Sequence, residues 1–263
     1  MDYPTTQYIQ IETKDGVATI TLDRPKANAY DPDFMGHLSN AVAQTDDNPS
    51  VKVVLIRSAS PKFFCAGADV KAFATNSNEV NQQLVLKARG VVERMRTSGK
   101  LFIAVIAGHT LGGGLELAMG CDLRFAAEGE YGLGLPEVKL GLMPGNGGCV
   151  ALPRLVGRSR AIDLLVTGRM IDPQEAYRLG LVDYLVPADQ LEAQARTYAN
   201  DLAKSAGRAI AEIKQCVYQS VHLDYDAALR AEADAVGKLY DTEDAAEGLR
   251  AFTEKREPQF TGR

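Results

Sequence analysis

The sequence predicts an α/β fold that ends in an all-helical region, and two observations predict it. Over the first two-thirds of the chain, short apolar runs typical of buried strands alternate with segments whose apolar residues recur at helical spacing. After Gln190, alanine, glutamate, leucine, lysine and arginine dominate, and strand-like runs are absent. We therefore expect a sheet with helical crossovers over residues 1–188 and a helical C-terminal region over residues 189–263.

The elements of the first part alternate in order along the chain. Short apolar runs, continuous or alternating, indicate strands, because a strand buries one or both of its faces. Segments with apolar residues three or four positions apart indicate the helices between them. The strands are expected at residues 17–22, 51–57, 101–106 and 123–126, and the helices at residues 33–46, 79–95 and 115–119.

The C-terminal region carries four segments rich in good helix formers. The break at Pro187-Ala188-Asp189 precedes the first of them, and Asp189 is a residue type that suits a helix N-cap. We expect the boundary between the two parts of the chain at this break. The four helices are expected at residues 191–204, 208–220, 225–239 and 243–255.

The charge of the chain argues against polyanionic partners. The 263 residues carry a formal net charge of −5, so neither nucleic acid nor an anionic membrane surface is an expected partner. No apolar run approaches the ~20 residues of a membrane span. The densest basic stretch is interrupted by Glu93, which is typical of a solvated helix face. Its members are Lys87, Arg89, Arg94, Arg96 and Lys100.

The cysteines and the N-terminus indicate a reducing compartment. The four cysteines form no CxxC pair, and the three histidines do not cluster with them at metal-ligand spacing. Residues 1–8 lack a basic segment followed by an apolar one, the pattern of a secretion signal. We therefore expect reduced thiols, no metal site and a cytoplasmic location.

Two turns rich in small residues could present free backbone N–H groups. Residues 66–69 (Ala-Gly-Ala-Asp) follow a predicted strand and let a ligand approach the backbone closely. Residues 112–114 are three glycines between a strand and a helix start. Each turn alone also fits an ordinary tight connection. Two such donors from different loops could together hold one carbonyl oxygen that gains negative charge in a reaction.

Glu116 and Glu137 are two acids in apolar settings. Glu116 lies in the first turn of the helix after the three glycines, and Glu137 lies between Pro136 and Val138. Either acid alone could cap a helix or suit its dipole. Two carboxylates in one apolar cleft would have raised or split pKa values, which suits one to act as acid and the other as base. Whether the two side chains meet depends on the fold.

Four ordered motifs identify a family. Together, and in this order, they make the chain resemble the enoyl-CoA hydratase/isomerase family, also called crotonases, from Leu22 to Arg256. The resemblance implies a spiral of ββα turns with an all-helical C-terminal trimerisation region, assembled as a trimer or a dimer of trimers. The motifs are AGAD at residues 66–69, GGGLELAMGCD at 112–122, PEVKLGLMPGNGG at 136–148 and VTGR at 166–169.

The resemblance also assigns roles to residues. The N–H groups of Ala68 and Gly113 would form the oxyanion hole, Glu116 and Glu137 would be the catalytic pair, and Gly145 would help to hold the reacting water. Phe252 and Lys255 would reach the CoA of a neighbouring subunit. The residues expected to contact the substrate and its CoA are Lys26, Ala66, Gly67, Ala68, Asp69, Val70, Lys71, Gly112, Pro136, Phe252 and Lys255.

The implied reaction is hydration of the 2,3 double bond of a trans-2-enoyl-CoA to a 3-hydroxyacyl-CoA. Glu116 would activate the water and Glu137 would protonate the α-carbon. No cofactor is expected, because CoA is part of the substrate. An enoyl-CoA isomerase using the acid at Glu137 and a specialised acyl-CoA dehydratase are the alternatives. A relative that binds RNA is disfavoured, because RNA binding needs a face rich in Lys and Arg, and the densest basic stretch here is modest. A purely structural subunit is disfavoured, because both acids and both glycine turns are intact.

Two positions depart from the family pattern. Tyr30 stands where many relatives carry leucine, and Cys149-Val150 replaces a frequent Thr-Gln pair. We interpret both Tyr30 and Cys149 as packing residues rather than catalytic ones, since no base adjoins Cys149 in the sequence. Met119 and Met143 are expected in the core or in the wall of the acyl pocket.

Overall fold

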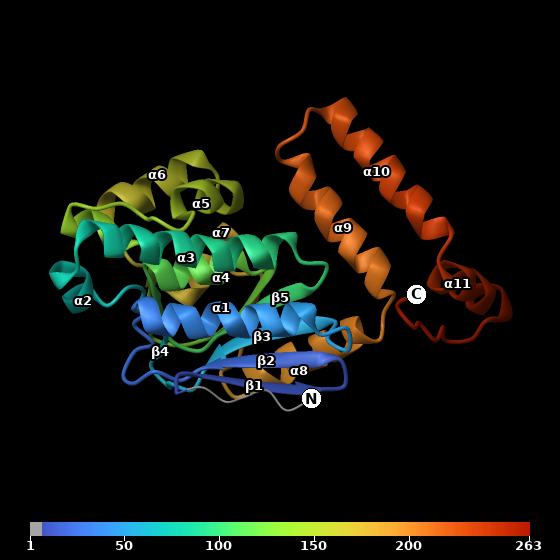
Figure 1. The fold of residues 1–263 in the computed structure, drawn as a ribbon, viewed down its shortest axis with the longest axis horizontal. Helices are drawn as coiled ribbons and strands as arrows, with labels where there is room; N and C mark the ends of the chain where they lie inside the picture. Colours follow the sequence, from blue (N-terminus) through green and yellow to red (C-terminus); the bar gives the residue numbers. More distant parts are fainter. Residues whose placement is uncertain (1–6) are drawn as a thin grey trace.

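The computed structural model describes residues 7–263, and nine strands in this part of the chain form two sheets (Figure 1). The larger sheet has the strand order β1-β2-β3-β5-β7-β9. β1 runs antiparallel to β2, and the other neighbouring strands are parallel. The strands are β1 (Ile9–Lys14), β2 (Val17–Leu22), β3 (Val53–Ser58), β5 (Leu101–Ile106), β7 (Leu123–Ala127) and β9 (Tyr184–Val186).

The smaller sheet gives the chain its spiral course. Its three strands, in the order β4-β6-β8, are parallel to one another. From β3 to β8, each turn of the chain adds one strand to the larger sheet, the next strand to the smaller sheet, and then a helix. This repetition is the expected ββα spiral. The strands of the smaller sheet are β4 (Phe63–Cys65), β6 (His109–Leu111) and β8 (Leu133–Gly134).

The helices of the spiral start at polar caps or at glycines. The Asp31 carboxylate accepts from the N–H of Phe34 at 2.9 Å and so begins α1, and Asp172 caps α7 in the same way. α4 and α5 begin at glycines instead, so no N-cap side chain covers their first N–H groups. The bounds are α1 (Pro32–Asp47), α2 (Val70–Thr75), α3 (Asn78–Thr97), α4 (Gly113–Gly120), the 3₁₀ helix η1 (Pro136–Leu140), α5 (Gly148–Val156), α6 (Arg158–Thr167) and α7 (Pro173–Leu179).

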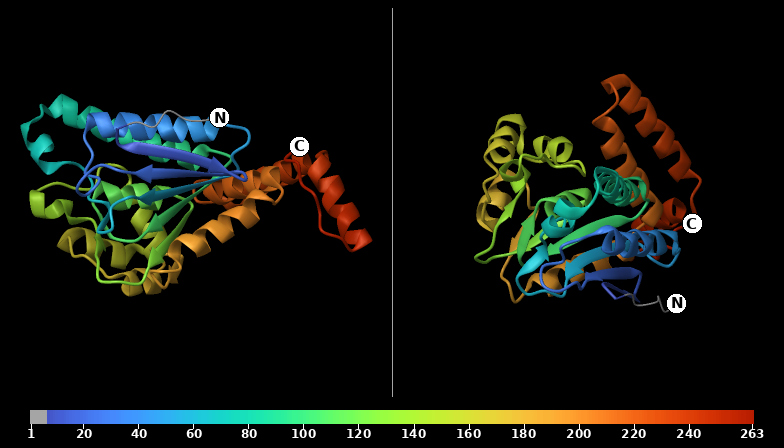
Figure 2. Two further views of the ribbon diagram at one scale, coloured as in Figure 1. Left: turned by 90° about the horizontal axis from the view of Figure 1, so that it is seen from below. Right: turned by 60° about the vertical axis from the view of Figure 1, so that its left-hand side comes forward.

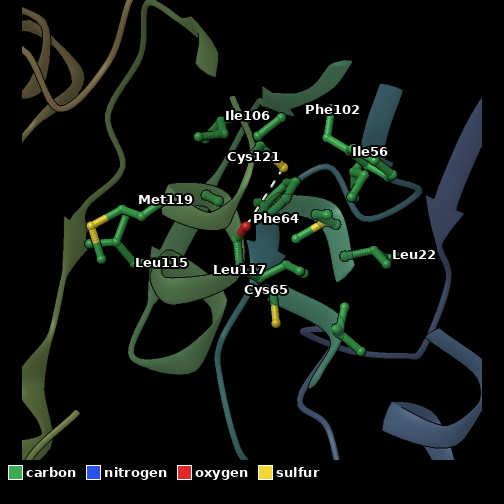
Figure 3. Close-up of a cluster of buried hydrophobic side chains, with 14 of the residues drawn as sticks. Leu22, Ile56, Phe64, Cys65, Phe102, Ile106, Leu115, Leu117, Met119 and Cys121 are labelled. Carbon is green, nitrogen blue, oxygen red and sulfur yellow. Dashed lines mark hydrogen bonds between the residues drawn. The ribbon is translucent and has the colours of Figure 1, made fainter. Parts of the chain in front are cut away.

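The larger sheet buries both of its faces. On one face, Ile56 of β3 and Phe102 of β5 pack in a core that includes side chains of α1, α3 and α4. On the other face, Leu55 and Ile103 pack against α8. Figure 3 shows the first core beside α4, where the buried Cys121 thiol donates to the backbone oxygen of Leu117. Burial on both faces explains why β3 and β5 read as continuous apolar runs.

The C-terminal region has one helix on the body and three that leave it. Leu191, Ala195 and Ala199 of α8 are buried against the sheet, whereas α9, α10 and α11 project away from the spiral (Figures 1 and 2). The buried ammonium of Lys214 fixes α9 to the body by bonding to Asp122 at 2.9 Å and to two backbone oxygens. The bounds are α8 (Leu191–Ala203), α9 (Gly207–Ser220), α10 (Tyr225–Tyr240) and α11 (Glu243–Glu254).

The predicted helices and strands agree with the structure, but the N-cap predicted for α8 does not. Every predicted helix and strand lies within two residues of an observed one at each end. The prediction that Asp189 caps α8 was wrong: Gln190 occupies the N-cap, its backbone is helical, and its side chain makes no capping bond. Asp189 instead lies in a turn closed by the N–H of Gln190 and the oxygen of Pro187. The boundary at residue 188 stays a prediction, as does the missing signal in residues 1–8, six of which lie outside the described residues.

Gly108, between β5 and β6, passes very close to the backbone just before β4, and this gives a test of packing. A Cβ at Gly108 would lie 2.4 Å from the backbone carbon and oxygen of Lys62, which cannot move without shifting the smaller sheet. We expect Gly108→Ala to lower the free energy of unfolding by about 2–3 kcal/mol. Gly90, in the middle of α3, has no heavy atom within 4 Å of such a Cβ, so Gly90→Ala should raise stability by about 0.5–1 kcal/mol. Denaturant unfolding measures both, and equal effects would contradict the packing.

Candidate active site

An apolar cavity of about 370 Å³ opens beside α2, α3, the start of α4 and η1. It collects side chains and backbone from five separate segments: the loop before α1, the β4–α2 turn together with α2, α3, the start of α4, and the stretch from η1 to the loop before α5. Ten of the predicted site residues line it: Ala66, Gly67, Ala68, Val70, Gly112, Gly113, Glu116, Pro136, Glu137 and Gly145. The other lining residues are Tyr30, Phe73, Ala74, Val85, Leu140, Leu142, Met143 and Asn146.

The backbone around Ala68 leaves one N–H group without a hydrogen-bond acceptor at the wall of this cavity. Tyr30 pairs with Ala68 as in a parallel sheet: its N–H donates to the oxygen of Gly67, and its oxygen accepts from the N–H of Asp69. In such a pairing the middle residue turns its own N–H to the opposite side. Within the described residues, the N–H groups of Ala68 and of Gly113 donate no hydrogen bond. Two free donors therefore border the same cavity.

Gly67 lets the two turns touch. Its φ is +84°, a left-handed conformation that glycine adopts without strain. A Cβ at this position would lie 2.9 Å from the oxygen of Leu111 and 3.0 Å from the nitrogen of Gly113. A side chain there would push the second turn away from the first. Glycine at position 67 thus sets the spacing between the N–H groups of Ala68 and Gly113.

Glu116 is a buried carboxylate held by backbone donors. It lies in the first turn of α4 and is 3% exposed. Its Oε1 accepts hydrogen bonds from the N–H groups of Asn146 and Gly148, both at 2.7 Å. Burial outweighs the other effects and raises the pKa of Glu116, although these two bonds and the positive charge of Arg89 act to lower it. The bonds stabilise the charged form and fix which way the carboxylate faces.

Glu137 has a different environment in the same cavity. It lies in the first turn of η1, where its Oε1 is close to Gly112. Its other oxygen, Oε2, is buried and has no hydrogen-bond partner. Burial raises the pKa of Glu137 to about 7, and the nearby charge of Glu116 adds to this rise. Near neutral pH, the proton therefore stays on Glu137 more readily than on an ordinary glutamate.

Tyr30 and Asn146 form a polar pair at this site that the sequence did not reveal. The Tyr30 hydroxyl accepts from Nδ2 of Asn146 at 2.8 Å and is 5% exposed. Burial raises the pKa of Tyr30, so the phenol stays protonated. Asn146 stands inside the quoted PGNGG motif, which was the only signal for it. Tyr30 both packs in the core and lines the cavity, and Met143 also lines the cavity while Met119 is buried.

Five predicted contact residues lie outside the cavity lining. Lys26 and Lys71 are exposed on the body, and Asp69 accepts from the N–H groups at positions 71 and 72 as the cap of α2. Phe252 and Lys255 are exposed at the end of α11, on the projecting helices. Their contacts with CoA stay predictions. Arg24, two positions before Lys26, pairs with Asp31.

The remaining chemistry of the described residues is simple. Over residues 7–263, no three His, Cys, Asp or Glu side chains gather as metal ligands would. No helix in the same range is long and apolar enough to cross a membrane. Burial raises the pKa of the Cys149 thiol, and the charges of Glu116 and Glu137 add to this rise. A raised thiol pKa disfavours the thiolate that a nucleophile requires.

Known proteins are similar to this chain in both sequence and fold. A family model described as enoyl-CoA hydratase/isomerase matches residues 12–263. A probable enoyl-CoA hydratase of Bacillus subtilis (strain 168) is 38% identical over 94% of this chain and 95% of its own length. A crotonyl-CoA hydratase of Syntrophomonas wolfei is 37% identical over 96% of this chain and 97% of its own.

The same likeness extends to solved structures. The crystal structure of an enoyl-CoA hydratase from Bacillus anthracis superposes with a TM-score of 0.94 at 37% identity, and the match covers 98% of this chain and 100% of that one. Sequence, spiral fold and paired glutamates therefore lead to one conclusion. The chain belongs to the enoyl-CoA hydratase/isomerase family, and its fold is the crotonase fold.

Proposed function

We propose that this protein adds water across the 2,3 double bond of a trans-2-enoyl-CoA and releases a 3-hydroxyacyl-CoA, reversibly. The observation that carries the proposal is the pair of glutamates in one apolar cavity, beside two free N–H donors. Their environments differ, which suits the two opposite proton transfers of a hydration. The relatives named as enoyl-CoA and crotonyl-CoA hydratases support the same reaction.

Glu116 is the proposed base. Its carboxylate accepts a proton from water, and the water oxygen attacks C3 of the enoyl group. The electrons of the double bond move to the thioester oxygen, which the N–H groups of Ala68 and Gly113 hold as it gains charge. The backbone donors at Glu116 stabilise an ionised carboxylate before the reaction, as a base requires.

Glu137 is the proposed acid. With a pKa raised to about 7, it is protonated in a large fraction of molecules at neutral pH and can donate this proton to C2 as the thioester carbonyl re-forms. Its unpaired Oε2 supports the neutral form, because a buried charge without partners is costly. Proton transfer from Glu116 to Glu137 between cycles restores both groups. The reaction proposed here needs no cofactor, because CoA enters and leaves with the substrate.

A panel of trans-2-enoyl-CoA thioesters tests this function. Loss of the enone absorbance, with a 3-hydroxyacyl-CoA as product, is the expected result, and chain length and branching can be varied within the panel. A 3-enoyl-CoA should be offered in parallel. Conversion of that compound to the 2-enoyl isomer, with no hydration of any 2-enoyl-CoA, would replace the hydratase proposal by an isomerase.

Lys71 and Lys255 are proposed cation contacts for the phosphates of CoA. Lys71 is exposed on α2, at the edge of the β4–α2 turn that lines the cavity. We expect Lys71→Ala and Lys255→Ala to raise KM several-fold, more at low salt, and to change kcat less, because phosphates lie far from the reacting carbons. Lys204→Ala, at an exposed position at the end of α8, is the control. Unchanged KM in both variants would reject these contacts.

A homo-oligomer built on trimers is the proposed assembly. Its support is the apolar surface on the three projecting helices, which a lone chain leaves open to water. We expect light scattering at micromolar concentration to give a trimer or hexamer mass, and a monomer mass would contradict it. A cytoplasmic location, supported by the isolated cysteines, is also proposed and can be tested by fractionation. The exposed apolar residues are Ile213, Val217, Val221, Tyr225, Leu229, Val236, Tyr240, Leu249 and Phe252.

A further inference from the structure

Arg89 differs from the other cations of its basic stretch. Arg94 pairs with Asp46 and Asp47, Arg96 pairs with Glu93, and Lys100 binds backbone oxygens at the C-terminal end of α1. Each of those contacts joins α3 or the residues after it to the end of α1, or lies within α3 itself. Arg89 instead extends from α3 to the loop before α5, and its Nε donates to the backbone oxygen of Gly145. This loop borders the proposed active site.

One peptide group connects Arg89 to Glu116. The oxygen of Gly145 and the N–H of Asn146 belong to the same peptide unit, which is trans, so they point in opposite directions. Arg89 binds the oxygen from one side. The N–H on the other side donates to Oε1 of Glu116 at 2.7 Å. The three groups therefore form one chain of hydrogen bonds, in which a cation at one end strengthens the donor at the other.

We propose that Arg89 is a positioning residue that acts through the Gly145–Asn146 peptide group, orienting and stabilising the Glu116 carboxylate as the base. This inference rests on the proposed function. Without the guanidinium, the peptide would lose the bond that fixes its plane, and the N–H at Asn146 would become a weaker and less directed donor. The N–H of Gly148 would remain as the second donor to Glu116.

The charges around Glu116 decide the direction of the effect. Arg89 on α3 faces it with positive charge, and Glu137 on η1 faces it with a carboxyl group. Tyr30 and Cys149 also face it, and burial raises the pKa of each, so both stay neutral near pH 7. Removing Arg89 takes away a charge that lowers the pKa of Glu116. The base then needs a higher pH to ionise, so the acid limb of the rate profile should move upward.

The test compares kcat and KM across pH for three single variants. In Arg89→Gln, we expect the acid limb of the kcat profile to move to higher pH. At a pH on this limb, kcat should be lower than in the wild type by roughly 3- to 10-fold, and KM should be unchanged. Arg89→Lys keeps the charge and should restore the limb in large part. Lys87→Gln removes an exposed cation two residues away on α3 and serves as the matched control. Its profile should equal that of the wild type.

Salt supplies a second readout. Arg89 is exposed, so added salt screens its charge. Raising ionic strength should move the wild-type acid limb upward and leave Arg89→Gln almost unaffected. A uniform loss of kcat at every pH, or an unshifted limb, would overturn the proposal. A raised KM with the wild-type profile would assign Arg89 to CoA binding and overturn it too. If the wild type hydrates no enoyl-CoA, the proposed function fails instead.

Discussion

Glutamine at either position 116 or position 137 should lower kcat for hydration by about 10²- to 10⁴-fold, the usual contribution of a positioned acid or base. Glutamine keeps the size of the side chain, and in Glu116→Gln the amide oxygen can still accept from the N–H groups that hold Glu116, so the fold and the cavity should persist. KM should change little, because most of the substrate's binding surface lies in its CoA. Glu79→Gln, at an exposed position in α3, is a control expected to behave as wild type.

The pH profile separates the two acids. Glu137 must be protonated to act as the acid, so kcat/KM of the wild type should fall as the pH rises through about 7. Glu137→Gln should lose this alkaline limb along with most of the rate. Glu116→Gln should lose the acid limb instead, because the group that must ionise is gone. Full hydration by either variant would reject the assigned roles. So would an alkaline limb that persists in Glu137→Gln or an acid limb that persists in Glu116→Gln.

Gly113→Ala is expected to reduce kcat by about 10²- to 10³-fold, as loss of an oxyanion donor does in other enzymes. The variant keeps its N–H group, but the new Cβ would lie 1.7 Å from the Tyr30 hydroxyl and 3.0 Å from Nδ2 of Asn146. Tyr30 pairs with the backbone around Ala68. Its displacement therefore moves the other donor of the proposed oxyanion hole, so a single methyl group should disturb both donors.

Shortening the neighbouring side chain tests that explanation. In Gly113→Ala/Tyr30→Leu, no hydroxyl opposes the new Cβ, and a substantial part of kcat should return. Gly237→Ala, in α10, has no heavy atom within 4 Å of its added Cβ and should leave kcat unchanged. Melting temperatures of all variants separate misfolding from a damaged site. Failure of the double variant to recover, with normal stability, would show that Tyr30 does not transmit the change.

The sequence predicted best those features that a short stretch of residues records by itself, such as a motif or an apolar run. Glu116 and Glu137 stand in motifs whose order could be read directly, and both line the cavity. β3 and β5 were predictable because burial on both faces makes a continuous apolar run. The strands β4, β6 and β8 were not, since two or three residues are too few to show alternation.

Contacts between distant segments were beyond the reach of pattern analysis. Tyr30 and Asn146 are 116 positions apart, and Arg89 and Gly145 are 56 apart. Each pair meets only because the spiral stacks its turns, and no periodicity records such a meeting. Arg89 accordingly looked like one more solvated cation in a basic stretch. The failed cap at Asp189 has a similar cause, since the turn before α8 determines which residue adopts the cap position.

The three projecting helices also matter while the chain is being made. They emerge from the ribosome after the spiral, and they carry large apolar side chains such as Tyr225, Leu249 and Phe252 in water. Until another surface covers these side chains, a fresh chain is prone to aggregate. Slower synthesis at low temperature should therefore increase the yield of well-folded protein, and a chaperone that shields apolar helices should do the same.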